Sequence, residues 1–256
     1  MKRSHAWIGA ETYQKERDFR GLVEGIHIPI CTAIRQRQGR PADPPYLFMD
    51  LNGGPGRLCD DDGRLFDGSP LIAANALFSA DIPHRTVHFE RDAKACRNLA
   101  AVMHPDSFPY STVISGDFQA GVSAWLDENP PHGYRYGLVY SDPIGDPIPV
   151  AEFNLFATHS PRVDLLAYVA ANSQYKRRGA HRLGEDVAAV RKRHALIREL
   201  ATAHEFTFVL FTNWTDFPAW RKQGFYPIDS HDGQRILYKA STTREERREL
   251  VEVPLW

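Results

Sequence analysis

Short apolar runs alternate with amphipathic stretches along most of the chain. Five runs have the length and apolar character of buried strands, and they lie at 46–51, 86–89, 112–115, 136–140 and 163–170. Stretches rich in helix formers separate them at 69–80, 91–103 and 118–128. Strands that alternate with helices predict right-handed crossovers into one parallel sheet. The expected fold class is therefore α/β, with a Rossmann-like doubly wound sheet.

The two ends of the chain depart from this alternation. Residues 12–36 carry apolar side chains at near-helical spacing and predict a leading helical region, which Pro29 should kink or divide. Residues 184–204 give the longest predicted helix, and 206–211 a sixth strand. The stretch GFYPIDS, the turn HDGQ and RILYKA then predict a hairpin that ends the sheet with an antiparallel strand.

Composition and charge are those of an ordinary globular protein. Hydrophobic residues make up 43% and charged residues 25%, with a formal net charge of -1, so any attraction to nucleic acid has to come from a local cluster. The cysteines and histidines show no metal-ligand spacing, and no apolar run approaches the roughly 18 residues that span a bilayer. We therefore expect a cytoplasmic protein with no metal site or membrane segment. It should comprise a helical extension over 1–40 and one domain over 41–256.

Acidic residues stand at the carboxyl ends of four successive predicted strands, namely Asp50, Glu90, Asp117 and Asp142. Ligands bind beyond these ends in an open α/β sheet. The turn after the first strand is rich in glycine, and its candidate residues are Asn52, Gly53, Gly54 and Gly56. Glycine lets the backbone approach a ligand closely, so the pattern predicts a nucleotide site. Asp92 and Asp117 are also placed to cap the helices that follow them.

These residues resemble the motif series of class I S-adenosylmethionine-dependent methyltransferases, which also end in an antiparallel hairpin strand. The resemblance implies S-adenosyl-L-methionine as cofactor and 41–256 as the catalytic domain. It implies that Asp50 and the glycine loop line the methionine end, that Glu90 binds the ribose, and that Asp117 with Phe118 binds the adenine. Gly53, Arg91 and Ser141 complete the expected cofactor-binding set.

Residues 46–147 also look like the three-Cys-motif partner proteins, a methyltransferase-like group. The shared features are DLNGGPG, the GSP that opens the next helix, and a fourth motif resembling LDPFG. Two features depart from a simple methyltransferase pattern. The segment RLCDDDGRLFDG lengthens the first loop, and Asn52 replaces the first glycine of the commonest loop.

The fourth motif, Ser141-Asp142-Pro143-Ile144-Gly145, resembles the signature of methyltransferases that act on exocyclic amines of bases. The resemblance implies that Asp142 and the carbonyl of Pro143 orient the amine, with adenine N6 the first acceptor to consider. An isoleucine and a glycine replace the second proline and the aromatic residue of that signature. Stacking on the base would then need Tyr140, Phe153 or Tyr175. Asp-Pro-x-Gly is also a common turn.

A basic cluster follows the fifth predicted strand, and its candidate substrate-binding residues are Tyr175, Lys176, Arg177 and Arg178. Cations beside an aromatic ring suit phosphate contacts and base stacking, so DNA or RNA is the expected partner. The alternative is a solvated loop before a helix.

Two other functions remain open. A nicotinamide-dependent oxidoreductase would use the same acids, but its G-x-G-x-x-G loop requires glycine where Cys59 stands. A catalytically inactive partner subunit would keep the S-adenosylmethionine pocket and bind another protein or nucleic acid.

Overall fold

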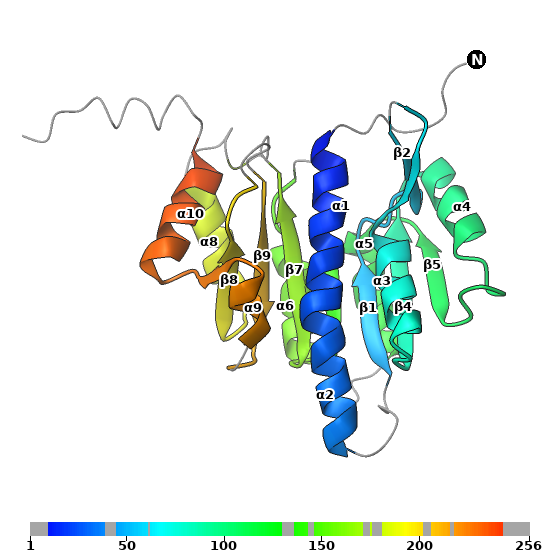
Figure 1. Cartoon of the computed structure of the whole chain (residues 1–256), viewed down its shortest axis with the longest axis horizontal. Helices are drawn as coiled ribbons and strands as arrows, with labels where there is room; N and C mark the ends of the chain where they lie inside the picture. The colour runs from blue at the N-terminus through cyan, green and yellow to red at the C-terminus, as the bar shows by residue number, and fades with distance from the viewer. Residues whose placement is uncertain are drawn as a thin grey trace, which may run out of the picture.

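The structure is a computed structural model that describes residues 10–38, 45–60, 62–129, 136–142, 146–170, 175, 181–201, 206–215 and 218–242. Its main sheet has the strand order β10-β8-β9-β7-β6-β1-β4-β5. The strands are β1 (Tyr46–Asp50), β4 (His84–Glu90), β5 (Ser111–Ser115), β6 (Gly137–Ser141), β7 (Val163–Val169), β8 (His194–Arg198), β9 (Thr207–Thr212) and β10 (Phe225–Pro227). Figure 1 shows helices both in front of and behind this sheet.

The five strands predicted first are confirmed as β1, β4, β5, β6 and β7. They pair in parallel in the order β5-β4-β1-β6-β7, which is the doubly wound arrangement with β1 at its centre. The expected Rossmann-like α/β fold is therefore confirmed. All five carboxyl ends lie along one edge of the sheet, which we call the carboxyl edge.

The sheet also ends in antiparallel strands, as predicted, but these strands are not the two halves of the predicted hairpin. β9 runs antiparallel to β7, β8 antiparallel to β9, and β10 antiparallel to β8. The single helix predicted over 184–204 is wrong, because α8 (His181–Ala189) ends early and β8 follows it. Leu196 is a good helix former, yet it and the β-branched Ile197 are both buried where β8 pairs with β9, so tertiary pairing overrides the helical pattern of this segment.

The predicted final hairpin is wrong in its second half. RILYKA lies in α10 (His231–Ser241), a helix whose N-cap is Ser230. The Ser230 hydroxyl accepts a hydrogen bond from the Gly233 N–H at 3.1 Å, and this capping signal was readable in the sequence.

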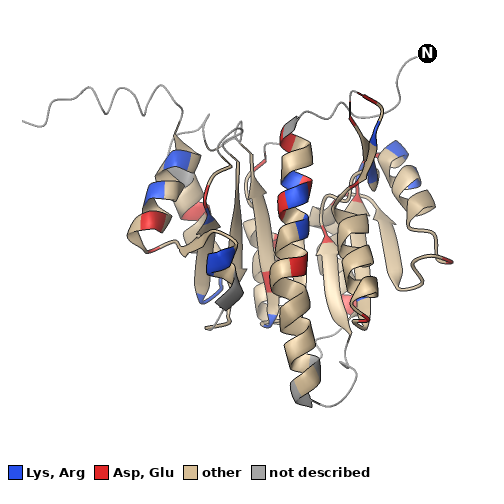
Figure 2. Ribbon diagram, viewed as in Figure 1, with Lys and Arg blue, Asp and Glu red and all other residues tan. Residues whose placement is uncertain are grey.

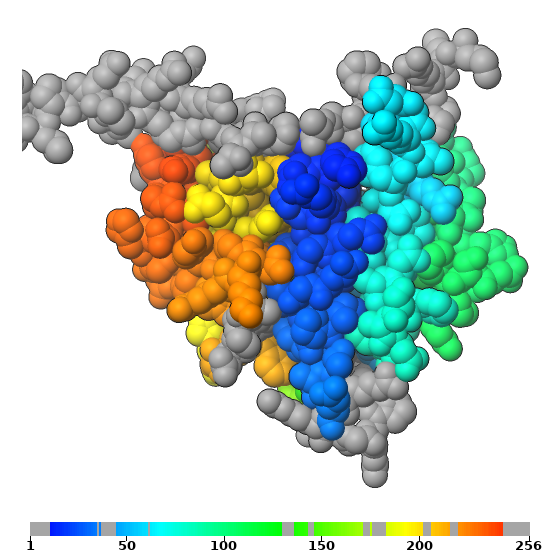
Figure 3. Space-filling view, in the orientation of Figure 1, coloured from blue at the N-terminus to red at the C-terminus, as the bar shows by residue number. Residues whose placement is uncertain are grey.

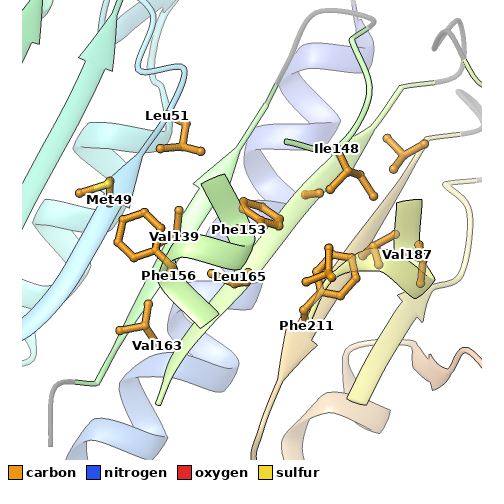
Figure 4. Close-up of a cluster of buried hydrophobic side chains, with 14 of the residues drawn as sticks. Met49, Leu51, Val139, Ile148, Phe153, Phe156, Val163, Leu165, Val187 and Phe211 are labelled. Carbon is orange, nitrogen blue, oxygen red and sulfur yellow. The ribbon is translucent and has the colours of Figure 1, made fainter. Parts of the chain in front are cut away.

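Two layers of helices cover the sheet. One face is packed by α5 (Phe118–Glu128), α6 (Val150–His159), α8 and α10 around a core that includes Met49, Phe153 and Phe211 (Figure 4). The other face carries the leading helices, α3 (Ser69–Ser79), α4 (Ala93–Val102) and α9 (Pro218–Lys222). No helix in the described part of the chain is both long and apolar enough to cross a membrane.

The leading helical region crosses the second face as α1 (Ala10–Leu22), a π-helical turn (Val23–His27) and α2 (Ile28–Gln38). The predicted leading helical region is confirmed, but it runs from Ala10 to Gln38 without a break. Pro29 has no N–H to continue the α-helical ladder, and the region widens locally into the π-helical turn directly before it. Phe19 is fully buried and stacks on Tyr140 of β6 at 4.4 Å between ring centroids. Figure 3 shows this region between α3 and the C-terminal elements, so the extension shares the core of the sheet.

Candidate functional site

The loop after β1 is bound to the end of β4. The N–H of Gly53 donates to the Phe89 carbonyl, and that of Gly54 to Oε2 of Glu90, both at 2.8 Å. Gly54 has a φ of +60°, and a Cβ atom added to it would meet nothing within 4 Å. The space beside Gly54, at the carboxyl edge, is therefore not filled by atoms of the described residues.

Gly56 serves packing instead. Its φ is +77°, and an added Cβ would come within 2.6 Å of Val102 and 2.8 Å of Leu99, both on α4. The same loop continues into β2 (Arg57–Cys59) and β3 (Leu65–Asp67), so the inserted segment forms a hairpin. The loop needs glycine at position 56 because α4 lies against it.

Glu90 is fixed at the end of β4 by two backbone donors. Oε2 accepts from Gly54, and Oε1 accepts from the N–H of Asp92 at 2.7 Å. A carboxylate oxygen accepts more than one hydrogen bond, so each oxygen can still receive a hydroxyl donor. Arg91 is exposed beside it. A fixed, half-exposed carboxylate beside an open glycine suits a ribose diol.

Asp50 is fully buried and both its oxygens are bonded within the protein. Oδ1 accepts from the N–H of Asn52 at 3.0 Å, and Oδ2 from the Ser69 hydroxyl at 2.6 Å. Burial raises the pKa of Asp50 to about 7. The residue ties the start of the glycine loop to the start of α3.

Asn52 joins the first loop to the fourth motif. Its Oδ1 accepts from the Ser141 hydroxyl at 3.2 Å and from the Asp142 N–H at 3.1 Å. A glycine has no side chain to make these bonds. The departure from the commonest methyltransferase loop therefore fixes the end of β6 against the end of β1.

The third strand tip carries a helix cap. Asp117 is exposed and its Oδ1 accepts from the Gln119 N–H at 2.9 Å, while Phe118 begins α5 and packs half-buried against the core. Asp92 caps α4 through the N–H groups of Lys94 and Ala95. Both predicted caps are confirmed. An N-cap role leaves the other oxygen of Asp117 available to a ligand.

Asp142 in the fourth motif forms an ion pair with a residue that is distant in sequence. Its Oδ2 accepts a short hydrogen bond from the ammonium group of Lys15 on α1. Lys15 Nζ also lies 3.3 Å from Oε1 of Glu16 and 5.3 Å from the ring centre of Tyr168. Although burial opposes its charge, the carboxylates of Asp142 and Glu16 raise the pKa of Lys15 above its usual value.

Sequence reasoning missed Lys15 and Glu16, although a signal was present. Both stand on the buried side of α1, four and three residues before the fully buried Phe19, and they are 9% and 5% exposed. Charged residues on an apolar helix face need partners, because burying an unpaired charge is unfavourable. Figure 2 shows the charged residues of α1 in the upper part of the leading helices, toward the carboxyl edge.

The aromatic residues considered for base stacking are all buried. Tyr140 and Phe153 are fully enclosed, and Tyr175 is 2% exposed. The Tyr175 hydroxyl donates to Asp186 and accepts from the Ile148 N–H, both at 2.7 Å, and burial raises its pKa. These contacts place Tyr175 in the core. Pro143, Lys176, Arg177 and Arg178 lie outside the described residues.

The strand order and the antiparallel end of the sheet define an α/β protein with a Rossmann-like fold, in which the glycine loop faces Glu90. No protein-family model and no curated protein matches the chain.

Several solved structures resemble it. One is the METTL16 MTase domain, with 10% identity, coverage of 66% of this chain and 60% of that one, and a TM-score of 0.42. A SAM-dependent methyltransferase from Agrobacterium tumefaciens has 13% identity, coverage of 81% and 63%, and a TM-score of 0.46. Human methyltransferase 10 domain containing protein has 8% identity, coverage of 74% and 83%, and a TM-score of 0.41.

The chain thus spans about three fifths of the length of the first two. Identities this low carry no statement about substrate or activity. They do not bear on the particular likeness to the three-Cys-motif partner proteins, which stays a prediction.

Proposed function

We propose that the chain is an S-adenosylmethionine-dependent methyltransferase. The observation that carries this proposal is the open space at Gly54 beside the fixed carboxylate of Glu90. A backbone without Cβ accommodates a nucleotide, and a carboxylate at this strand end accepts from the two ribose hydroxyls. When bound, the cofactor would supply an electrophilic methyl group.

The remaining candidate residues fit the same cofactor in different ways. Asp117 would accept a hydrogen bond from the adenine amino group with the oxygen that the helix cap leaves over. Asp50 and Asn52 would act by holding the loop, because their side-chain oxygens are already bonded within the protein. The cofactor would lie across the ends of β1, β4 and β5.

The acceptor we propose is an exocyclic amine of a nucleic-acid base, with adenine N6 first. Asp142 lies at the end of β6, with its N–H held by Asn52 and its Oδ2 held by Lys15. Its Oδ1 has no hydrogen bond from the described residues and would accept one from the amine. Fixing an amine N–H in this way turns the nitrogen lone pair toward the methyl group, and such positioning is worth large rate factors.

Transfer of labelled methyl groups to DNA and RNA tests the acceptor. We expect a labelled product that Asp142→Ala reduces about 100-fold, a size typical of lost positioning, with unchanged affinity for S-adenosylmethionine. Asp142→Asn keeps an acceptor oxygen and should retain more activity. Asp127→Ala, on the exposed surface of α5, is the control.

Two results would contradict this assignment. No labelled nucleic acid under any condition would refute the base amine as acceptor. Normal cofactor binding without transfer to any substrate, unaffected by Asp142→Ala, would favour the inactive partner subunit.

A further inference from the structure

Carboxylates outnumber the cation where α1 meets the carboxyl edge. Asp50, Asp142 and Glu16 repel one another electrostatically, and Lys15 is the cation that pairs with two of them. Burial, with repulsion from Asp142 and Asp50, raises the pKa of Glu16 to about 7 despite the attraction of Lys15. The cluster therefore places three carboxyl groups beside one ammonium group in a poorly solvated place.

Glu16 also has an unused oxygen. Oε1 faces Lys15 at 3.3 Å, whereas Oε2 is buried and has no hydrogen-bond partner among the described residues. The residue is only 5% exposed, so solvent does not replace the missing donor. A buried carboxylate oxygen without a donor is unfavourable, and in a ligand site it indicates where a donor binds.

We propose that Glu16 binds the ammonium group of the methionine end of S-adenosylmethionine. This inference rests on the proposed function. An ammonium group has three N–H donors and a positive charge, so it supplies the donor that Oε2 lacks and favours the ionised form of Glu16. The glycine loop that begins at Asp50 is the place implied for the methionine end. Glu16 is connected to that loop through Lys15, which contacts Asp142. The N–H of Asp142 donates to Asn52 in the loop.

The inference gives α1 a direct part in the site. Lys15 would keep Asp142 in position for the acceptor, while its neighbour Glu16 would select the cationic end of the donor. The leading helix would then contribute to both halves of the reaction, although it comes before the whole sheet in the chain.

Calorimetric titration of the full chain with three probes tests the inference. S-adenosylmethionine and S-adenosylhomocysteine both carry the ammonium group, whereas methylthioadenosine keeps the adenosine and thioether but lacks the amino-acid end. We expect Glu16→Gln to weaken binding of the first two about 10-fold to 100-fold, the range for a lost charged hydrogen bond. The affinity of Glu16→Gln for methylthioadenosine should change by no more than about twofold. This change is smaller than the loss of about tenfold, or 1.4 kcal/mol, expected at least for the two ligands that carry the ammonium group.

Glu24→Gln is the matched control, because it changes an exposed glutamate on the same helical region. Equal weakening of all three probes by Glu16→Gln would overturn the inference and indicate a structural role. Unchanged affinity for S-adenosylmethionine would overturn it as well. Absence of any S-adenosylmethionine binding to the unaltered protein would instead overturn the proposed function, and this inference with it.

Discussion

The two halves of the carboxyl edge differ in how their polar groups are satisfied. Around Gly54 and Glu90, donors and acceptors pair within one loop and the neighbouring strand end. Around Asp142, buried charge is balanced only in part, by Lys15 from a helix 127 residues away in sequence. In the first half backbone N–H groups hold the carboxylate of Glu90, whereas in the second half the carboxylate of Asp142 depends on tertiary packing for its partner. This contrast predicts different responses to substitution.

The largest expected effect comes from Lys15→Met, which removes the cation from the second half. Breaking a buried pair leaves unpaired charge and typically costs about 3–5 kcal/mol. Urea unfolding at pH 8 should show a loss of stability in this range. The control Arg20→Met removes a cation that is 42% exposed and pairs with Glu24 on the surface, so it should cost less than about 1 kcal/mol. Similar small losses for both variants would contradict the importance of the buried pair.

Gly56→Ala should be the most damaging single change in the first half. The variant adds left-handed backbone strain of about 1–2 kcal/mol to overpacking of about 1–3 kcal/mol against Val102 and Leu99. Gly63→Ala measures the backbone strain alone, because Gly63 has a φ of +81° with nothing within 4 Å of an added Cβ, so the difference between the two variants is the overpacking. Urea unfolding should therefore show a larger loss of unfolding free energy for Gly56→Ala than for Gly63→Ala. Equal losses would mean that the side chains of α4 shift to accommodate the methyl group without loss of stability.

Glu16→Gln should change how stability depends on pH. The pKa of Glu16 rises from 4.5 to about 7 on folding, so the folded protein holds a proton that the unfolded chain releases between these values. Unaltered protein should therefore lose stability relative to Glu16→Gln as pH rises from about 4.5 to 7, by at most about 1.4 kcal/mol per unit.

The charged and titratable groups that interact with Glu16 are Lys15, Asp50, Asp142, Tyr140 and Tyr168. They are common to both proteins, so the difference in unfolding free energy measured across pH reports on Glu16. A constant difference from pH 5 to 8 would show that Glu16 does not titrate in this window.

Gly54→Ala should have a small effect on folding and a clear one on binding. Nothing lies near the added methyl group, so stability should fall only by the backbone cost of about 1–2 kcal/mol. The methyl group would occupy the space proposed for the cofactor and should weaken S-adenosylmethionine binding more than tenfold. Unchanged S-adenosylmethionine binding by Gly54→Ala would show that the cofactor does not lie against this loop.

Local patterns in the sequence were sufficient for the first half of the site. The parallel strands, their acidic ends and the caps at Asp92 and Asp117 follow from short-range periodicity and side-chain hydrogen bonding. The second half was not predictable in this way, because the pairing of Lys15 with Asp142 requires α1 to be docked on the sheet. The helical pattern over 184–204 and the basic cluster that begins at Tyr175 mislead for the same reason, since the pairing of β8 with β9 and the bond from Tyr175 to Asp186 are both tertiary.

The proposed function requires that this edge of the sheet bind S-adenosylmethionine through Glu90. Calorimetric titration of the purified chain with S-adenosylmethionine and, in parallel, with NAD tests it most directly, using Glu90→Ala beside Glu128→Ala, an exposed glutamate at the far end of α5. We expect the unaltered protein to bind S-adenosylmethionine saturably and NAD not at all. Binding should be lost in Glu90→Ala and kept in Glu128→Ala. Binding of NAD, or S-adenosylmethionine binding that is indifferent to Glu90, would contradict it.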